Sequence, residues 1–120
     1  MLYIGVDLGT SAVKLLLMEG DGRIRRIVSR EYPIYFPNPG WSEQNPQDWF
    51  TQTVEGVREL VSEADRDQVA GISFGGQMHG LVILDKDDNV IRPAILWNDG
   101  RTQAETDYLN NEIGKDKLSK

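Results

Sequence analysis

The residues best suited to chemistry lie in a short segment near the start of the chain, Gly5-Val6-Asp7-Leu8-Gly9-Thr10-Ser11. It contains one carboxylate, two hydroxyls and glycines that leave backbone amides accessible. Because Mg²⁺ keeps several waters and takes only one or two protein carboxylates, Asp7 alone could face a magnesium ion bridging nucleotide phosphates. The ordinary alternative is a hairpin in which Asp7 caps the turn, Gly9 takes a positive φ, and Thr10 and Ser11 bond local amides.

Three further features could join this turn in a site. Lys14, in the apolar run Ala12–Met18, could offset phosphate charge, or it could extend its ammonium group to solvent. His79, the single histidine, lies in the loop Gly75-Gly76-Gln77-Met78-His79-Gly80, directly after an apolar run. Ligands often bind at the carboxyl ends of strands, so Gln77 and His79 could bond hydroxyl groups, although a lone loop histidine is commonly incidental.

The segment Trp97-Asn98-Asp99-Gly100-Arg101 is the last candidate. Asn98 and Asp99 suit the hydroxyls of a polyol, and the ring of Trp97 suits the C–H surface of a sugar. A plain strand-to-helix turn explains the same residues equally well. We expect Trp41 and Trp49, in contrast, to be structural anchors.

The elements that must position these residues are predicted in the order β-β-β-α-β-β-β-α. The first three strands form an antiparallel meander, and Asn45 caps a helix that has Pro46 at its first position. A capping box from Thr102 to Glu105 begins the second helix, which Gly114 ends. The predicted strands cover residues 2–6, 12–18, 23–36, 69–74, 81–84 and 90–97. The buried helix faces are predicted to contain Phe50, Val54, Val57, Leu60, Val61 and Ala64 in the first helix, and Ala104, Tyr108, Leu109 and Ile113 in the second.

Composition excludes several classes of protein. The chain has 120 residues, 39% of them hydrophobic and 27% charged, which is typical of one globular α/β domain at most. A net charge of -6 argues against a nucleic-acid partner. We expect neither a signal peptide nor a membrane span, and the absence of cysteine fits a reducing, cytoplasmic location. The tail Lys115–Lys120 has little apolar content that could close a core, so we expect the chain to be part of a longer protein.

Four collinear segments together resemble the FGGY family of carbohydrate kinases, which belongs to the actin-like ATPase superfamily with a ribonuclease-H-like fold. They are YIGVDLGTSAVK at 3–14, GWSEQNPQDWF at 40–50, GISFGGQMHG at 71–80 and RPAILWNDGR at 92–101. The last two resemble most closely the members that phosphorylate D-xylulose. The resemblance implies that residues 1–120 are the N-terminal part of the kinase N-terminal domain, and that the C-terminal domain is absent.

The resemblance also implies roles for individual residues. Asp7 would be the catalytic acid near Mg²⁺ and the γ-phosphate of ATP, and Gly9, Thr10, Ser11 and Lys14 would bind the phosphates. Gln77, Met78, His79, Trp97 and Asp99 would form the sugar site. The base that takes the hydroxyl proton is, in this family, an aspartate far downstream, and no residue here matches it. We therefore expect residues 1–120 alone to lack kinase activity.

Two other interpretations stay open. The sugar could be another pentulose, a hexulose or a polyol. Alternatively, the chain could be a non-catalytic, actin-like binding fragment, an interpretation supported by the missing base. A homodimer is also compatible with the sequence, because a partial domain can associate through an unpaired strand edge.

Overall fold

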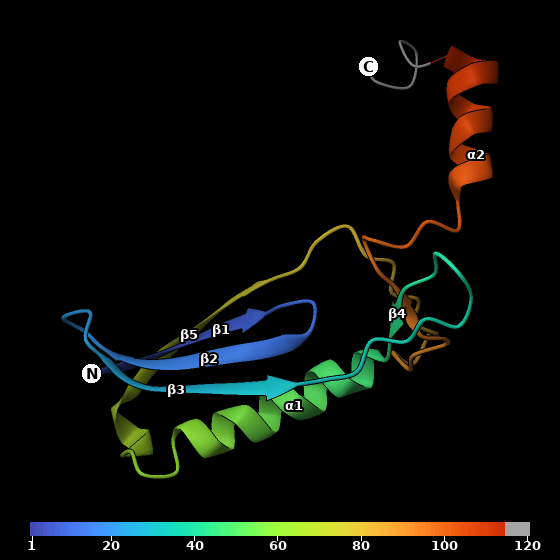
Figure 1. The fold of residues 1–120 in the computed structure, drawn as a ribbon. Coiled ribbons are helices and arrows are strands. Elements are labelled where there is room, and N and C mark those ends of the chain that lie inside the picture. The colour runs from blue at the N-terminus through green and yellow to red at the C-terminus, as the bar shows by residue number, and fades with distance from the viewer. Residues whose placement is uncertain (115–120) are drawn as a thin grey trace.

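A computed structural model describes residues 1–114 of the chain. Its centre is a four-stranded sheet in the order β3-β2-β1-β5. β1 (Leu2–Leu8), β2 (Ala12–Glu19) and β3 (Ile24–Glu31) form an antiparallel meander, and β5 (Val69–Gly76) pairs parallel to β1. The helix α1 (Pro46–Leu60) follows β3 and precedes β5 in the chain. In space, it lies on one face of the sheet (Figure 1). The predicted meander and helix are confirmed.

The core lies between α1 and one face of the sheet. Alternate residues of the strands point toward the helix and are buried, whereas their neighbours face the side that α1 does not cover. Asp7 and Lys14 belong to this second set. The buried cluster consists of Leu2, Ile4, Val6, Val13, Leu15, Leu17, Val28, Tyr32, Leu60 and Val61.

The start of α1 follows its sequence signals. The side chain of Asn45 accepts a hydrogen bond from the backbone amide of Gln47, and Pro46 occupies the first turn, as predicted. The predicted apolar face is only partly right. Leu60 and Val61 are buried, but Phe50 is 66% exposed. It lines an apolar depression with Phe74 of β5, and no described segment covers that depression.

The segment from residue 81 to 97 differs from the prediction. Instead of two strands it contains isolated bridges and the short strand β6 (Ala94–Ile95). β6 pairs antiparallel with β4 (Glu43–Gln44), in a stretch for which no strand is predicted. Pro93 lacks a backbone donor just before β6, which limits a longer ladder there. The third predicted strand, residues 23–36, also proves too long, because β3 ends at Glu31.

The C-terminal helix departs most from expectation. α2 (Gln103–Tyr108) continues as a π-helical turn, η2 (Leu109–Gly114), and Thr102 makes no capping bond through its side chain. Gly114, the last described residue, has a φ of 99°. The face predicted to be buried is exposed, because α2 projects away from the sheet (Figure 1). A one-turn 3₁₀ helix, η1 (Arg66–Gln68), precedes β5. The predicted polar tail, 115–120, lies outside the described residues.

Gly56 offers a test of the packing between α1 and the sheet. A Cβ atom at this position would lie 2.6 Å from Cδ1 of Leu15, whose side chain is fully buried. We expect Gly56→Ala to lower the free energy of unfolding by about 1–3 kcal/mol through overpacking, despite the better helix propensity of alanine. Amide hydrogen exchange in β2 and α1 measures the effect. Thr51→Ala, on the exposed side of α1, is the control and should not accelerate exchange.

Candidate functional site

The turn between β1 and β2 is closed by a main-chain hydrogen bond. The amide of Gly9 donates to the carbonyl of Ala12 over 2.9 Å. The positive φ that the hairpin alternative assigns to Gly9 is not observed, because only Gly22, Gly40 and Gly114 are positive-φ glycines among the described residues. Glycine fits here for another reason: a Cβ would lie 3.0 Å from the Ala12 oxygen. The requirement for glycine is therefore close backbone approach.

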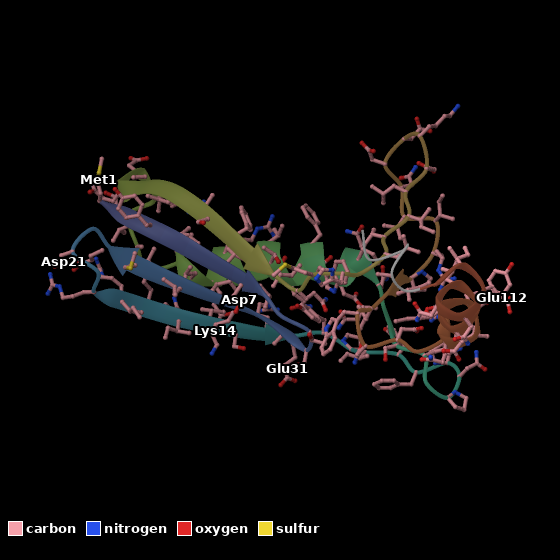
Figure 2. The ribbon with its side chains drawn as sticks, turned by 90° about the horizontal axis from the view of Figure 1, so that it is seen from above. Met1, Asp7, Lys14, Asp21, Glu31 and Glu112 are labelled. Atoms are coloured by element: carbon pink, nitrogen blue, oxygen red, sulfur yellow. The ribbon has the colours of Figure 1, made fainter. Side chains whose placement is uncertain are left out.

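Asp7 and Lys14 stand directly opposite one another in the antiparallel β1–β2 register. Their side chains consequently share one face of the sheet, the face that α1 does not cover. Figure 2 shows both residues toward the same end of neighbouring strands. A surface depression there is lined by both side chains and by Ser73, Phe74 and Gly75 of β5. This pair offers one carboxylate and one ammonium to a ligand that carries both metal and phosphate.

The loop after β5 approaches the same turn. The amide of Gln77 donates to the carbonyl of Leu8 over 2.8 Å, which extends the parallel pairing past the end of β5. Met78 is 71% exposed, and His79 is exposed with a φ of 60°. Both side chains are therefore accessible to a ligand. The structure brings Gln77 to the β1–β2 turn, and it places Met78 and His79 just beyond it.

The loop after β6 also reaches the turn. Nε1 of Trp97 donates to Oγ1 of Thr10 over 3.3 Å, so a predicted sugar residue and a predicted phosphate residue are in direct contact. The indole remains 56% exposed. Three segments that are distant in sequence thus meet at the β1–β2 turn: the turn itself, the Gln77 loop and the Trp97 loop.

Asp99 lies in the Trp97 loop but is not open to a ligand. Its carboxylate is 2% exposed and bonds the guanidinium of Arg101, with 2.7 Å between Oδ2 and an Arg101 amino nitrogen. Oδ2 also accepts from the backbone amide of Ser42 over 2.6 Å. The bonded guanidinium, assisted by the backbone amides, holds the pKa of Asp99 well below its usual range. This geometry suits a role in fixing the loop more than direct contact with a substrate.

Arg101 extends this cluster into the segment that precedes α1. It also bonds Glu43 over 2.7 Å, and its guanidinium stacks 3.8 Å from the centre of the Trp41 ring. Arg92 pairs with the same Glu43 carboxylate. The interpretation of Trp41 as a structural anchor is confirmed. Trp49 is a second one, because it packs against the core and bonds Gln44.

Comparison with known proteins agrees with this architecture. A family model described as the FGGY family of carbohydrate kinases, N-terminal domain, matches residues 2–120. The chain belongs to this family. The fold agrees as well: the crystal structure of xylulose kinase from Rhodospirillum rubrum gives a TM-score of 0.90 at 28% identity, over 98% of this chain and 24% of that one.

The FGGY relatives that resemble this chain include more than one named activity. Xylulose kinase of Bacillus subtilis (strain 168) is 48% identical over 113 residues, which are 92% of this chain and 23% of that protein. Gluconate kinase from Lactobacillus acidophilus, a solved structure, gives a TM-score of 0.88 at 31% identity, covering 92% of this chain and 22% of that one. The chain spans about a quarter of the length of these relatives.

Two residues of this FGGY domain that contact the turn were missed by sequence reasoning. Gln44 bonds both Thr10 and Gln77, and Tyr32 is buried behind the turn, where its hydroxyl donates to the Gly9 carbonyl and its amide donates to Ser11 over 3.2 Å. Neither carries a local signal, because Gln44 lies in the two-residue strand β4 and Tyr32 directly follows the edge strand β3. No helix in the described part of the chain is long and apolar enough to cross a membrane.

Tyr32 gives the turn a measurable pH dependence. Burial, together with the negative charge of Asp7, raises the pKa of Tyr32 to about 12. The folded protein therefore holds this proton more tightly than the unfolded chain, where tyrosine ionises near pH 10. We expect its contribution to stability to be complete below pH 10 and to fall as the pH rises from 10 to 12. Tyr32→Phe should reduce the loss of unfolding free energy between pH 10 and 12, measured by urea unfolding at each pH. An unchanged pH dependence would contradict the assignment to Tyr32.

Proposed function

We propose that the protein to which residues 1–120 belong is an ATP-dependent kinase that transfers a phosphoryl group to the 5-hydroxyl of D-xylulose. The observation that carries the proposal is the direct contact of Trp97 with Thr10, together with the approach of the Gln77 loop to the same turn. Phosphoryl transfer depends mainly on positioning and charge neutralisation, so a phosphate site and a sugar site must adjoin. The similarity to xylulose kinases supports this choice of sugar.

The turn and its neighbours suit the phosphate side of this reaction. Asp7 would hold Mg²⁺, and Thr10 and Ser11 would bind phosphate oxygens through amides and hydroxyls. Gly9, whose own amide is bonded to Ala12, would let the turn approach the phosphates closely. The donor set fits magnesium, because one carboxylate on an open face leaves room for waters and phosphate oxygens. The metal, when bound, supplies charge neutralisation on the transferring phosphoryl group. The ammonium of Lys14, opposite Asp7, would add to it.

The two loops suit the sugar side. Met78 and His79 are exposed beyond Gln77, and the open ring of Trp97 could pack against the C–H surface of the ketose. For Asp99 we propose a structural contribution, since its carboxylate is already bonded to Arg101 and Ser42. The proton-accepting base would come from a part of the protein outside residues 1–120, so these residues alone should show no turnover. We also propose a cytoplasmic location and, from the position of β5 at an edge of the described sheet, a homodimer.

The test is a coupled ATP assay on the full-length protein with a panel of pentuloses, hexuloses, polyols and gluconate. We expect the highest kcat/KM with D-xylulose. A clear preference for gluconate, which the similarity to a gluconate kinase makes the second candidate, would replace the sugar but retain the enzyme class. Absence of phosphorylation with every compound would contradict the proposal.

A non-catalytic, actin-like role is the alternative from another class. His79→Ala in the full-length protein separates the two possibilities, because the side chain is exposed and its loss should leave the fold intact. A kinase should show a higher KM for the sugar with this variant. An unchanged KM would favour a binding fragment in which the Gln77 loop has no substrate role.

A further inference from the structure

Gln44 is a polar side chain buried between the segments that form the site. It is 1% exposed, and it lies in β4 immediately before the first turn of α1. Its Nε2 donates to the Thr10 carbonyl over 2.5 Å, and its Oε1 accepts from Nε1 of Trp49 over 3.0 Å and from Nε2 of Gln77 over 3.1 Å. One amide therefore joins the β1–β2 turn, α1 and the Gln77 loop.

The partners of Gln44 determine which way its amide points. A backbone carbonyl such as that of Thr10 can only accept, and the indole N–H of Trp49 can only donate. The amide of Gln44 must consequently place its nitrogen toward Thr10 and its oxygen toward Trp49. Since this oxygen also faces Gln77, only the NH₂ group of Gln77 can bond it. The Oε1 atom of Gln77 is then left buried without a partner within residues 1–114.

We propose that Gln44 is a positioning residue for the kinase reaction. It fixes the turn that would bind phosphate relative to the loop that would bind sugar, and it fixes the orientation of the Gln77 amide. This inference rests on the proposed function, because it concerns the alignment of ATP with the sugar. An error of about 1 Å in such an alignment can reduce turnover by a factor of about 100.

Two substitutions in the full-length enzyme separate the contacts. Gln44→Met keeps the volume and removes the bonds to Thr10, Trp49 and Gln77. We expect it to raise the KM for ATP and the KM for the sugar by about tenfold each and to lower kcat. Gln44→Glu keeps the oxygen that accepts from Trp49 and Gln77 but turns a second oxygen, in place of the NH₂ group, toward the Thr10 carbonyl. It should raise the KM for ATP alone, and it tests the proposal if the methionine variant does not fold.

Gln52 supplies the matched control. It lies on α1, and its amide oxygen accepts from Nε of Arg30 over 2.7 Å without contacting the turn or either loop. Gln52→Met should alter stability at most and leave both KM values within twofold of the wild type. Equal kinetic effects of Gln44→Met and Gln52→Met would overturn the inference, as would a Gln44→Glu variant that affects sugar and ATP alike.

A double variant tests whether Gln44 acts on the sugar through Gln77. If it does, Gln44→Met should add nothing to the sugar KM in a Gln77→Met background, while its effect on the ATP KM persists. Additive effects on the sugar KM would overturn this part of the inference. The proposed function fails separately, if the wild-type enzyme phosphorylates none of the ketoses, polyols or gluconate.

Discussion

Asp7→Asn in the full-length protein should reduce kcat by roughly 10²–10³-fold with D-xylulose as substrate. The substitution keeps the size of the side chain and removes the charge that we assign to the magnesium site. Within residues 1–114 no ion pair of the structure uses the Asp7 carboxylate, so the fold does not depend on it. The thermal midpoint of unfolding should therefore remain close to that of the wild type.

Asp88→Asn is the matched control for this experiment. Asp88 lies in an exposed turn far along the chain, with a φ of 65° that asparagine tolerates well. The same chemical change at this position should leave kcat unchanged. If Asp7→Asn retained full turnover at saturating magnesium, or if it lost activity only together with its folded structure, the assignment of Asp7 to the metal would be wrong.

The sequence predicts those parts of the fold that local patterns determine. The apolar run at 2–6 and the alternation after it indicate strands, and Asn45 followed by Pro46 marks the start of α1. Each of these signals involves only a few neighbouring residues. It therefore holds in any fold that buries one face of the strand or helix. The segment 81–97 shows the opposite case. Ala94 and Ile95 of this segment pair with Glu43–Gln44, which lies about fifty residues earlier and is itself too short to carry a strand pattern.

The exposed side of α2 illustrates a second limit. Tyr108, Leu109 and Ile113 have helical spacing, which predicts a buried face, yet they are exposed in the described structure. Periodicity identifies which side of a helix is apolar, and a tertiary partner decides whether that side is buried. Phe50 of α1 and Phe74 of β5 are exposed for the same reason, because no described segment packs over them.

The candidate site divides in the same way. The β1–β2 turn and the two loops can be found from the sequence, because glycines and polar residues follow apolar runs there. The side chains that join them cannot. Gln44 contacts Thr10 across 34 positions, and Tyr32 contacts Gly9 across 23. Whether Asp99 faces a ligand or a guanidinium is likewise decided by tertiary packing, which the motif does not reveal.

Removing the Arg101 guanidinium should release the Trp97 loop from the segment before α1. Arg101→Met leaves the Asp99 carboxylate buried without its cation, a change that is strongly destabilising in comparable sites. The amide of Ser42, which donates to Asp99, should exchange with solvent on the order of a hundredfold faster in the full-length protein. The KM for the sugar should rise as well, because Trp97 would no longer be held against Thr10.

Asp99→Asn removes the charge while its amide oxygen can still accept from Ser42, so the effect on exchange should be much smaller. Asp99→Asn should also remove a dependence of the free energy of unfolding on acid pH. The bonded guanidinium holds the pKa of Asp99 below that of the unfolded chain, near 3.9. The stabilisation is therefore complete above about pH 4 and is lost as the pH falls below that value. Asp99→Asn should reduce the loss of unfolding free energy below about pH 4. If the variant kept the pH dependence of the wild type, that dependence would belong to other carboxylates.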